Sequence, residues 1–128
     1  MDIPFLSDDG VKDDTFIKVA GEYAEGVYAS GPRDFSENPI YKEAVAAHKE
    51  EYESDPGPFF PEAYSAALAL LNAIEVADST EYDAIVQALQ NNYVDTAVGR
   101  IKFDEKGDAE GVGFSMYQVQ DGQYVELK

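Results

Sequence analysis

Ser7-Asp8-Asp9-Gly10 is the first part of the stretch of sequence that decides the fold. An amphipathic segment, 11–20, follows it, and Ala24-Glu25-Gly26-Val27 comes next. This order predicts a strand, an acidic turn, a helix and a second strand that opens with a carboxylate. Carboxylates at strand ends beside a glycine are well placed to reach a ligand in the crevice of an α/β sheet. The stretch therefore predicts an α/β fold with its site near these carboxylates.

The rest of the chain continues the mixture of helical and extended patterns. Asn38-Pro39 is a helix start signal, and Asp121-Gly122 is a hairpin signal. The patterns predict helices at 13–20, 39–52, 61–77 and 82–90, and strands at 3–6, 25–30, 98–103, 113–120 and 123–127. The helix at 61–77 is the most apolar, and we expect Leu68, Leu71 and Ile74 to face inward.

Charge is the unusual feature of the composition. The chain has 128 residues, the size of one ordinary domain, and a net charge of −17. Such acidity argues against nucleic acid, whose phosphates need Lys and Arg, and against an anionic membrane surface. A well-solvated surface is the simpler interpretation, and a saline or cation-rich habitat is the alternative.

The sequence carries no signature of a metal, a cofactor or catalysis. There is no cysteine, so neither a disulfide nor a thiolate metal site is expected. His48 is the single histidine, which makes it a weak metal ligand and a poor catalytic group. No nucleophile elbow, phosphate-binding loop or dinucleotide fingerprint is present. No run of 18 apolar residues exists, so no transmembrane segment is predicted.

Several short motifs, taken in order, carry a resemblance to a known family. They are Phe5-Leu6-Ser7-Asp8-Asp9-Gly10, Val19 to Val27, Pro32-Arg33-Asp34, Gly57-Pro58-Phe59-Phe60, Ala63 to Ala67, Gly99 to Asp108 and Phe114 to Val119. The chain resembles the second half of a branched-chain amino acid binding protein, the substrate-capture subunit of a bacterial ABC transporter. The resemblance implies the three-layer, Rossmann-like lobes of a type I periplasmic binding protein, which would be incomplete here, and no enzymatic activity.

The resemblance also implies a division into lobes and a location. Residues 1–50 and 112–128 are expected to belong to the second lobe and residues 51–111 to the first, with hinge crossings near 55–58 and 107–113. The implied location is periplasmic or at the cell surface. The beginning, Met1-Asp2-Ile3-Pro4, lacks the basic and apolar regions of a signal peptide, so we interpret the chain as a fragment or a truncated reading frame.

Five residues are the candidates for ligand binding. Glu25 is the first, because the resemblance implies that it accepts hydrogen bonds from the ammonium group of an amino acid; an exposed strand-edge glutamate is the alternative. Asp9, or Asp8 in its place, could accept from the same ammonium, but a turn-capping role is equally open. The aromatics Phe60 and Tyr64 could line the cleft or simply pack in the core.

The expected function is therefore capture of branched-chain or similar amino acids for ABC transport, with permease subunits as partners of the full-length protein. A sensory, regulatory or chain-association module is the alternative. The groups expected to grip the ligand carboxylate belong to a part of the family fold that precedes this chain. We expect the chain alone to bind amino acids poorly, and its apolar helix could lead it to form a homodimer.

Overall fold

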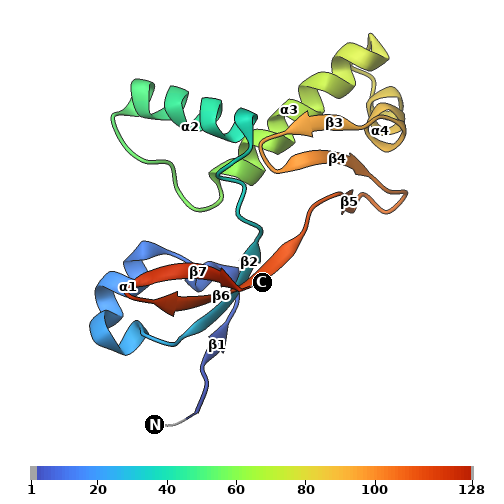
Figure 1. Cartoon of the computed structure of the whole chain (residues 1–128). Coiled ribbons are helices and arrows are strands. Elements are labelled where there is room, and N and C mark those ends of the chain that lie inside the picture. The colour runs from blue at the N-terminus through green and yellow to red at the C-terminus, as the bar shows by residue number, and fades with distance from the viewer. Residues whose placement is uncertain (1–2, 128) are drawn as a thin grey trace. The chain divides into compact units, whose positions relative to one another are not determined.

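The computed structural model describes residues 3–127, which form two compact units (Figure 1). Unit 1 contains the described residues up to Asp34 and those from Gly113 onward, and unit 2 spans Phe35–Val112. This division differs from the expected boundary after residue 50. Residues 35–50 pack in unit 2, where the Asn38 side chain donates a hydrogen bond to the carbonyl of Thr96 (2.9 Å). The assignment of these units to lobes stays a prediction.

Unit 1 is built on a four-stranded sheet whose order is β1-β2-β6-β7. The strands are β1 (Leu6–Ser7), β2 (Tyr28–Pro32), β6 (Phe114–Gln120) and β7 (Gln123–Leu127). β1 and β2 run parallel, and the other pairs are antiparallel. Asp121 and Gly122 join β6 to β7 with φ angles of 52° and 73°, the positive values that a tight hairpin turn requires.

One face of this sheet is covered by three short helical segments. They are η1 (Asp9–Val11), α1 (Asp14–Ala20) and η2 (Gly21–Ala24). The core beneath them consists of Ala24, Val27 and Val119, with Phe16, Ile17, Ala20 and Tyr124 packed around it. Figure 1 shows α1 beside the β6–β7 hairpin, although the two lie about 100 residues apart in the sequence. The carboxyl-terminal hairpin therefore completes a core begun by the first 30 residues.

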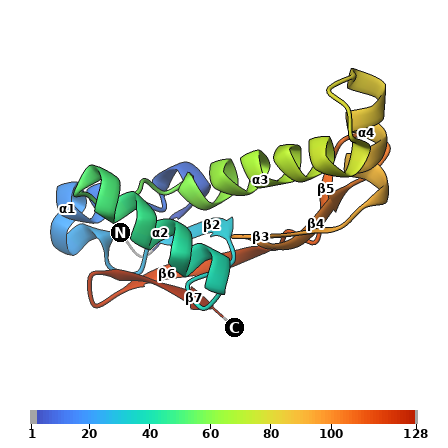
Figure 2. The ribbon, with the colours of Figure 1, turned by 90° about the horizontal axis from the view of Figure 1, so that it is seen from above.

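Unit 2 combines three helices with a small antiparallel sheet of order β3-β4-β5 (Figure 2). Its elements are α2 (Pro39–Tyr52), α3 (Phe60–Ala77), α4 (Tyr82–Asn91), β3 (Val94–Thr96), β4 (Gly99–Phe103) and β5 (Ala109–Glu110). Ala69, Val98 and Ile101 form its core. The helices and β4 lie where the sequence predicts them, and the α/β class is confirmed. β3 and β5 were not predicted, because two or three residues beside a turn show too little alternation. The strand predicted to open with Glu25 begins instead at Tyr28, since Glu25 ends the helical segment η2.

The buried stripe of α3 differs from the predicted one. Ser65, Ala69 and Ala73, spaced four residues apart, face the interior, whereas Leu71 is 63% exposed. Small side chains let the backbone of α3 approach its neighbours closely, and the Ser65 hydroxyl accepts a hydrogen bond from the backbone N–H of Val98 (3.2 Å). Of the side chains predicted to face inward, Leu68 and Ile74 are half-buried beside this stripe, and Leu71 is exposed.

Asn38 links the start of α2 to β3, and its removal should weaken unit 2. Its side-chain oxygen accepts from the backbone N–H groups of Ile40 (2.8 Å) and Tyr41 (3.4 Å), while its amide donates to Thr96. We expect Asn38→Ala to lower the free energy of unfolding by about 2 kcal/mol, because a helix cap and a tertiary hydrogen bond are lost together. Denaturant unfolding followed by circular dichroism measures this loss. Asn91→Ala, which removes an exposed intrahelical bond to Gln87, is the control, and equal losses would contradict the linking role.

Candidate functional site

The turn from Ser7 to Lys12 lies at the carboxyl end of β1 and is fixed by hydrogen bonds on both sides. Its own backbone closes through Val11 N–H to Asp8 O (3.3 Å) and Lys12 N–H to Asp9 O (3.1 Å). From across the sheet, the Tyr124 hydroxyl donates to the carbonyl of Val11 (2.7 Å). The turn therefore holds Asp8, which is exposed, and Asp9, which is half-buried, at a defined place beside the parallel strand pair.

Lys12 extends from this turn across the sheet toward Tyr117. Its ammonium lies 4.0 Å from the centre of the Tyr117 ring, a cation–π distance. A side chain at Gly31 would meet the Lys12 chain at 2.8 Å, so glycine at that position makes room for it. The Tyr117 hydroxyl donates to the carbonyl of Pro32, and burial, with the carboxylates of Glu126 and Asp34, raises the Tyr117 pKa to about 12. A neutral ring thus supports the lysine at all ordinary pH values.

Glu25 lies at the other end of the same sheet. It precedes β2, whereas Asp9 follows β1, and because β1 and β2 are parallel these two positions are at opposite ends. The Glu25 carboxylate accepts hydrogen bonds from the backbone N–H groups of Asp121 (3.0 Å) and Gly122 (3.3 Å). The structure therefore brings Asp8 and Asp9 together but places Glu25 at the β6–β7 turn, where it has a structural role.

Phe60 and Tyr64 belong to an aromatic cluster within unit 2. Their ring centres are 5.8 Å apart, and His48 packs edge-on against Phe60 at 5.1 Å and in a tilted arrangement against Tyr52 at 4.8 Å. The cluster joins the end of α2 to the start of α3. His48 is half-buried by these contacts, and its Nδ1 lies 3.2 Å from the carbonyl oxygen of Ser54. The sequence alone does not indicate this packing of His48 against aromatic rings.

The other features of residues 3–127 give little support for a further binding site. Within residues 3–127 no group of three or more His, Asp or Glu side chains could hold a metal ion. In the same range no helix is both long and apolar enough to cross a membrane. An open hollow in unit 2, at the start of α2, is lined by Asn38, Pro39, Ile40, Asp95, Thr96, Gly99 and Arg100, none of which is a predicted site residue.

Sequence reasoning missed the residues that hold the acidic turn in place. Tyr117 and Tyr124 lie more than 100 residues from Lys12 and Val11, and only the pairing of β2 with β6 brings them together. No local sequence pattern indicates these contacts, because Lys12 merely follows a turn and the two tyrosines lie in distant strands. The acidic turn, in contrast, was found from the sequence because its chemistry and its strand end are contiguous.

The fold and the acidic turn define an α/β unit with carboxylates at the carboxyl end of a parallel strand pair, a usual place for a ligand. The chain belongs to the periplasmic binding protein family, whose model matches residues 3–123. Among curated relatives, the leucine-, isoleucine-, valine-, threonine- and alanine-binding protein of Pseudomonas aeruginosa is 32% identical over 129 residues, covering 100% of this chain and 35% of the relative. The Leu/Ile/Val-binding protein of Escherichia coli is 31% identical over 113 residues, covering 88% of this chain and 30% of the relative.

Solved structures agree with this fold. A leucine-binding protein from Thermotoga maritima matches with a TM-score of 0.82 and 27% identity, over 100% of this chain and 37% of that structure. An ABC transporter substrate-binding protein from Desulfitobacterium hafniense, in complex with Leu, matches with a TM-score of 0.74, 22% identity and 99% and 36% coverage. The resemblance to branched-chain amino acid binding proteins is confirmed, and the chain spans about a third of the length of these relatives.

Proposed function

We propose that this chain contributes part of an amino acid binding site to an extracytoplasmic substrate-binding protein that serves an ABC permease and has no enzymatic activity. The observation that carries the proposal is the acidic turn at the carboxyl end of the β1–β2 pair, in a chain whose relatives are named for the amino acids that they bind. Branched-chain or similar amino acids are the proposed ligands. The proposed location is the periplasm or the cell surface.

In this proposal Asp9 accepts a hydrogen bond from the ligand ammonium, and Asp8 adds negative charge beside it. A half-buried carboxylate on a fixed turn forms a stronger bond to an ammonium than a mobile, fully solvated one does. Tyr124 and Val11 support the mechanism indirectly, because their hydrogen bond holds the turn against the sheet. Phe60 and Tyr64, predicted from the sequence as contacts for an aliphatic ligand side chain, pack in the aromatic cluster of unit 2, and their contact with a ligand stays a prediction.

Glu25 can serve the proposed function in two ways. As expected from the resemblance, it could accept from the ligand ammonium through lone pairs that the backbone N–H groups of Asp121 and Gly122 leave open. Alternatively, it only fixes the hairpin that carries Tyr117 and Tyr124. The second role is the one that we propose, because the two hydrogen bonds hold the carboxylate at the β6–β7 turn, at the end of the sheet opposite Asp9.

A chimera tests the proposal. This chain replaces the aligned third of the Pseudomonas aeruginosa relative, and calorimetry measures leucine binding. We expect Asp9→Asn to weaken binding by about 2 kcal/mol, roughly thirtyfold in Kd, because the ammonium loses its charged partner. Asp121→Asn, an exposed carboxylate at the other end of the sheet, is the matched control and should change Kd little.

Glu25→Gln in the same chimera separates the two roles of Glu25. A loss at Glu25 as large as the expected loss at Asp9, without a loss of thermal stability, would place the ammonium site at Glu25. Unchanged leucine affinity in both the Asp9 and the Glu25 variants would remove this sheet from the ligand site altogether. A chimera that folds but binds no amino acid would favour the regulatory or chain-association alternative.

A further inference from the structure

Aspartate is followed directly by glycine at two places in the chain, Asp9-Gly10 and Asp121-Gly122. Asp-Gly is the dipeptide most open to spontaneous isomerisation, because glycine has no side chain to keep its backbone nitrogen away from the neighbouring carboxyl group. Both steps lie in turns of unit 1, one in the acidic turn and the other between β6 and β7. The N–H groups of the two glycines have different surroundings.

The isomerisation needs no partner other than water. The backbone nitrogen of the glycine loses its proton and attacks Cγ of the preceding aspartic acid, so that an N–Cγ bond forms and the carboxyl hydroxyl leaves with that proton as water. One water then opens the five-membered imide, and opening at the α-carbonyl leaves the main chain running through the former side chain, as isoaspartate. The nitrogen has to turn toward Cγ, so a bond that fixes the glycine N–H slows the reaction to the rate at which the turn opens.

Glu25 fixes the Asp121-Gly122 step. Its carboxylate accepts hydrogen bonds from the N–H of Asp121 through Oε1 (3.0 Å) and from the N–H of Gly122 through Oε2 (3.3 Å). The strands close on both sides of the turn, where Gln120 pairs with Gln123. Ring closure would require the Gly122 N–H to leave a charged acceptor and the hairpin turn to open.

The Asp9-Gly10 step lacks this restraint. The N–H groups of Val11 and Lys12 close the acidic turn onto the carbonyls of Asp8 and Asp9. The Gly10 N–H finds no acceptor among residues 3–127, and the Asp8 side chain makes no capping hydrogen bond to this turn. Gly10 is also exposed, so water reaches the step. Its nitrogen is therefore free to approach the Asp9 carboxyl group.

We propose that Asp9 is a site of spontaneous isomerisation and that Glu25 protects Asp121 from the same reaction. Isomerisation adds a methylene group to the main chain at Asp9 and takes it from the side chain, so the carboxylate leaves its place on the acidic turn. The consequence for binding rests on the proposed role of Asp9 as the acceptor of the ligand ammonium. The chain then loses its binding capacity with age at the acidic turn, while the β6–β7 hairpin stays intact.

Ageing of the folded 128-residue chain in neutral buffer tests the proposal without any ligand. Trypsin separates the two steps into the peptides 1–12 and 107–128, and electron-transfer fragmentation distinguishes isoaspartate from aspartate in each. We expect isoaspartate to form about tenfold faster at Asp9 than at Asp121, the change that one hydrogen bond to a charged group makes in a local opening equilibrium. In urea the two rates should become similar, because the restraint belongs to the fold.

Glu25→Gln tests the protection itself. Glutamine keeps the size of the side chain but has no charge and one acceptor atom where glutamate has two. Isoaspartate at Asp121 should therefore form about tenfold faster in this variant. Glu22→Gln is the matched control, since Glu22 is an exposed glutamate of the neighbouring segment η2, and it should leave both rates unchanged. Circular dichroism of each variant confirms that the chain is folded.

Gly10→Ala is the converse variant. A methyl group at this position would lie 3.4 Å from Asp8 Oδ1, an ordinary contact, so alanine fits the turn and shields its own nitrogen. Isoaspartate at Asp9 should form several-fold more slowly. In the chimera with the Pseudomonas aeruginosa relative, the fraction of protein that binds leucine should fall with age in step with isoaspartate at Asp9. Full leucine binding by isomerised protein would count against the proposed role of Asp9 in binding and not against the isomerisation.

Three results would overturn the proposal. The first is equal formation of isoaspartate at the two steps in the folded chain. The second is an unchanged or slower reaction at Asp121 in Glu25→Gln, which would mean that the carboxylate does not protect the turn or assists the attack as a base. The third is a difference between the two steps that persists in urea, because the local sequence and not the fold would then set the rates.

Discussion

Gly111→Ala is expected to lower the free energy of unfolding of unit 2 by about 3 kcal/mol or more. Gly111 follows β5 with a φ of 96°, a backbone conformation that side chains disfavour. A methyl group there would also lie 2.3 Å from the backbone oxygen of Arg100, which belongs to the neighbouring strand β4. Backbone atoms cannot move aside as a flexible side chain can, so the β4–β5 pairing has to shift.

Gly107→Ala is the matched control for this substitution. Gly107 has a similar φ of 87°, but nothing lies within 4 Å of the position that its methyl group would take. We expect a cost of about 1 to 2 kcal/mol there, from backbone strain alone. Amide hydrogen exchange at Lys102 and Phe103, which pair with β5, measures the local effect. Equal protection in the two variants would show that the close approach to Arg100 carries no energy.

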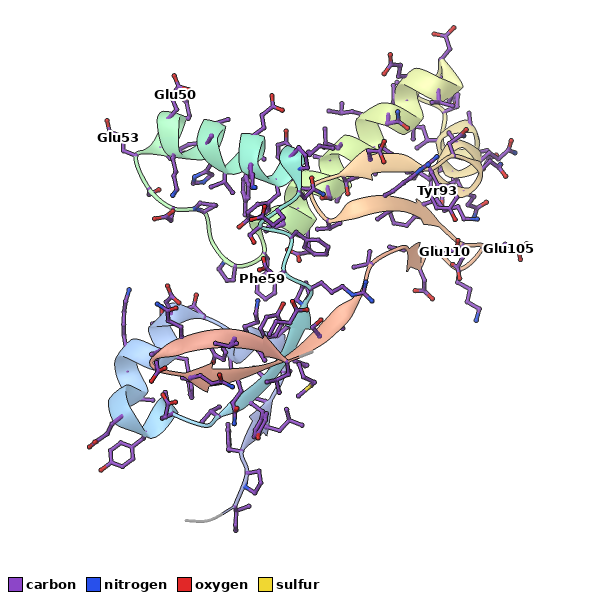
Figure 3. All side chains as sticks on the ribbon, in the orientation of Figure 1. Glu50, Glu53, Phe59, Tyr93, Glu105 and Glu110 are labelled. Carbon is purple, nitrogen blue, oxygen red and sulfur yellow. The ribbon has the colours of Figure 1, made fainter. Side chains whose placement is uncertain are left out.

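Salt should stabilise the whole chain strongly. The net charge is −17, from 26 acidic and 9 basic residues, and several carboxylates stand where the local structure disfavours them. Glu50 and Glu53 lie at the carboxyl end of α2, the negative end of the helix dipole, and Figure 3 shows their side chains and that of Glu105 extending away from the ribbon. With 26 acidic against 9 basic residues, the negative charges of the chain repel one another through solvent, and salt screens this repulsion.

Unfolding in urea at increasing sodium chloride measures the effect. From about 0.01 M to about 1 M salt the screening length falls from about 30 Å to about 3 Å. We expect the free energy of unfolding to rise by on the order of 2 kcal/mol as the repulsion disappears. Potassium chloride should act equally, because screening depends on ionic strength. A much larger gain from one cation at equal ionic strength would contradict screening and indicate specific binding.

Local signals in the sequence predicted the elements of this fold well. Asp13 accepts from Thr15 N–H at the start of α1, Asn38-Pro39 begins α2, and Asp121-Gly122 turns β6 into β7, each through chemistry confined to a few residues. The hydrogen bonds from Thr15 also lower the pKa of Asp13, as expected for a capping carboxylate. Such features need no knowledge of the remaining chain.

Features that depend on distant residues were not predictable in the same way. The inward face of α3 follows from how closely the chain around Val98 approaches it, which favours Ser65 over Leu71. The candidate site shows the same limit. Asp8 and Asp9 are adjacent in sequence, but the distance of Glu25 from them follows from the parallel register of β1 and β2, and its bond to Asp121 spans 96 residues.

The pairing of β2 with β6 also has a consequence for biosynthesis. Tyr28 pairs with Gln118, so β2 can pair with β6 only after about 90 further residues have been synthesised. Unit 2 is continuous from Phe35 to Val112 and can fold while β6 and β7 are still being translated. During that interval the part of unit 1 that precedes Phe35 lacks β6 and β7, and Val119 is missing from its core. Nascent chains stalled before Gly113 would therefore expose this segment to chaperones and proteases, while unit 2 is already complete.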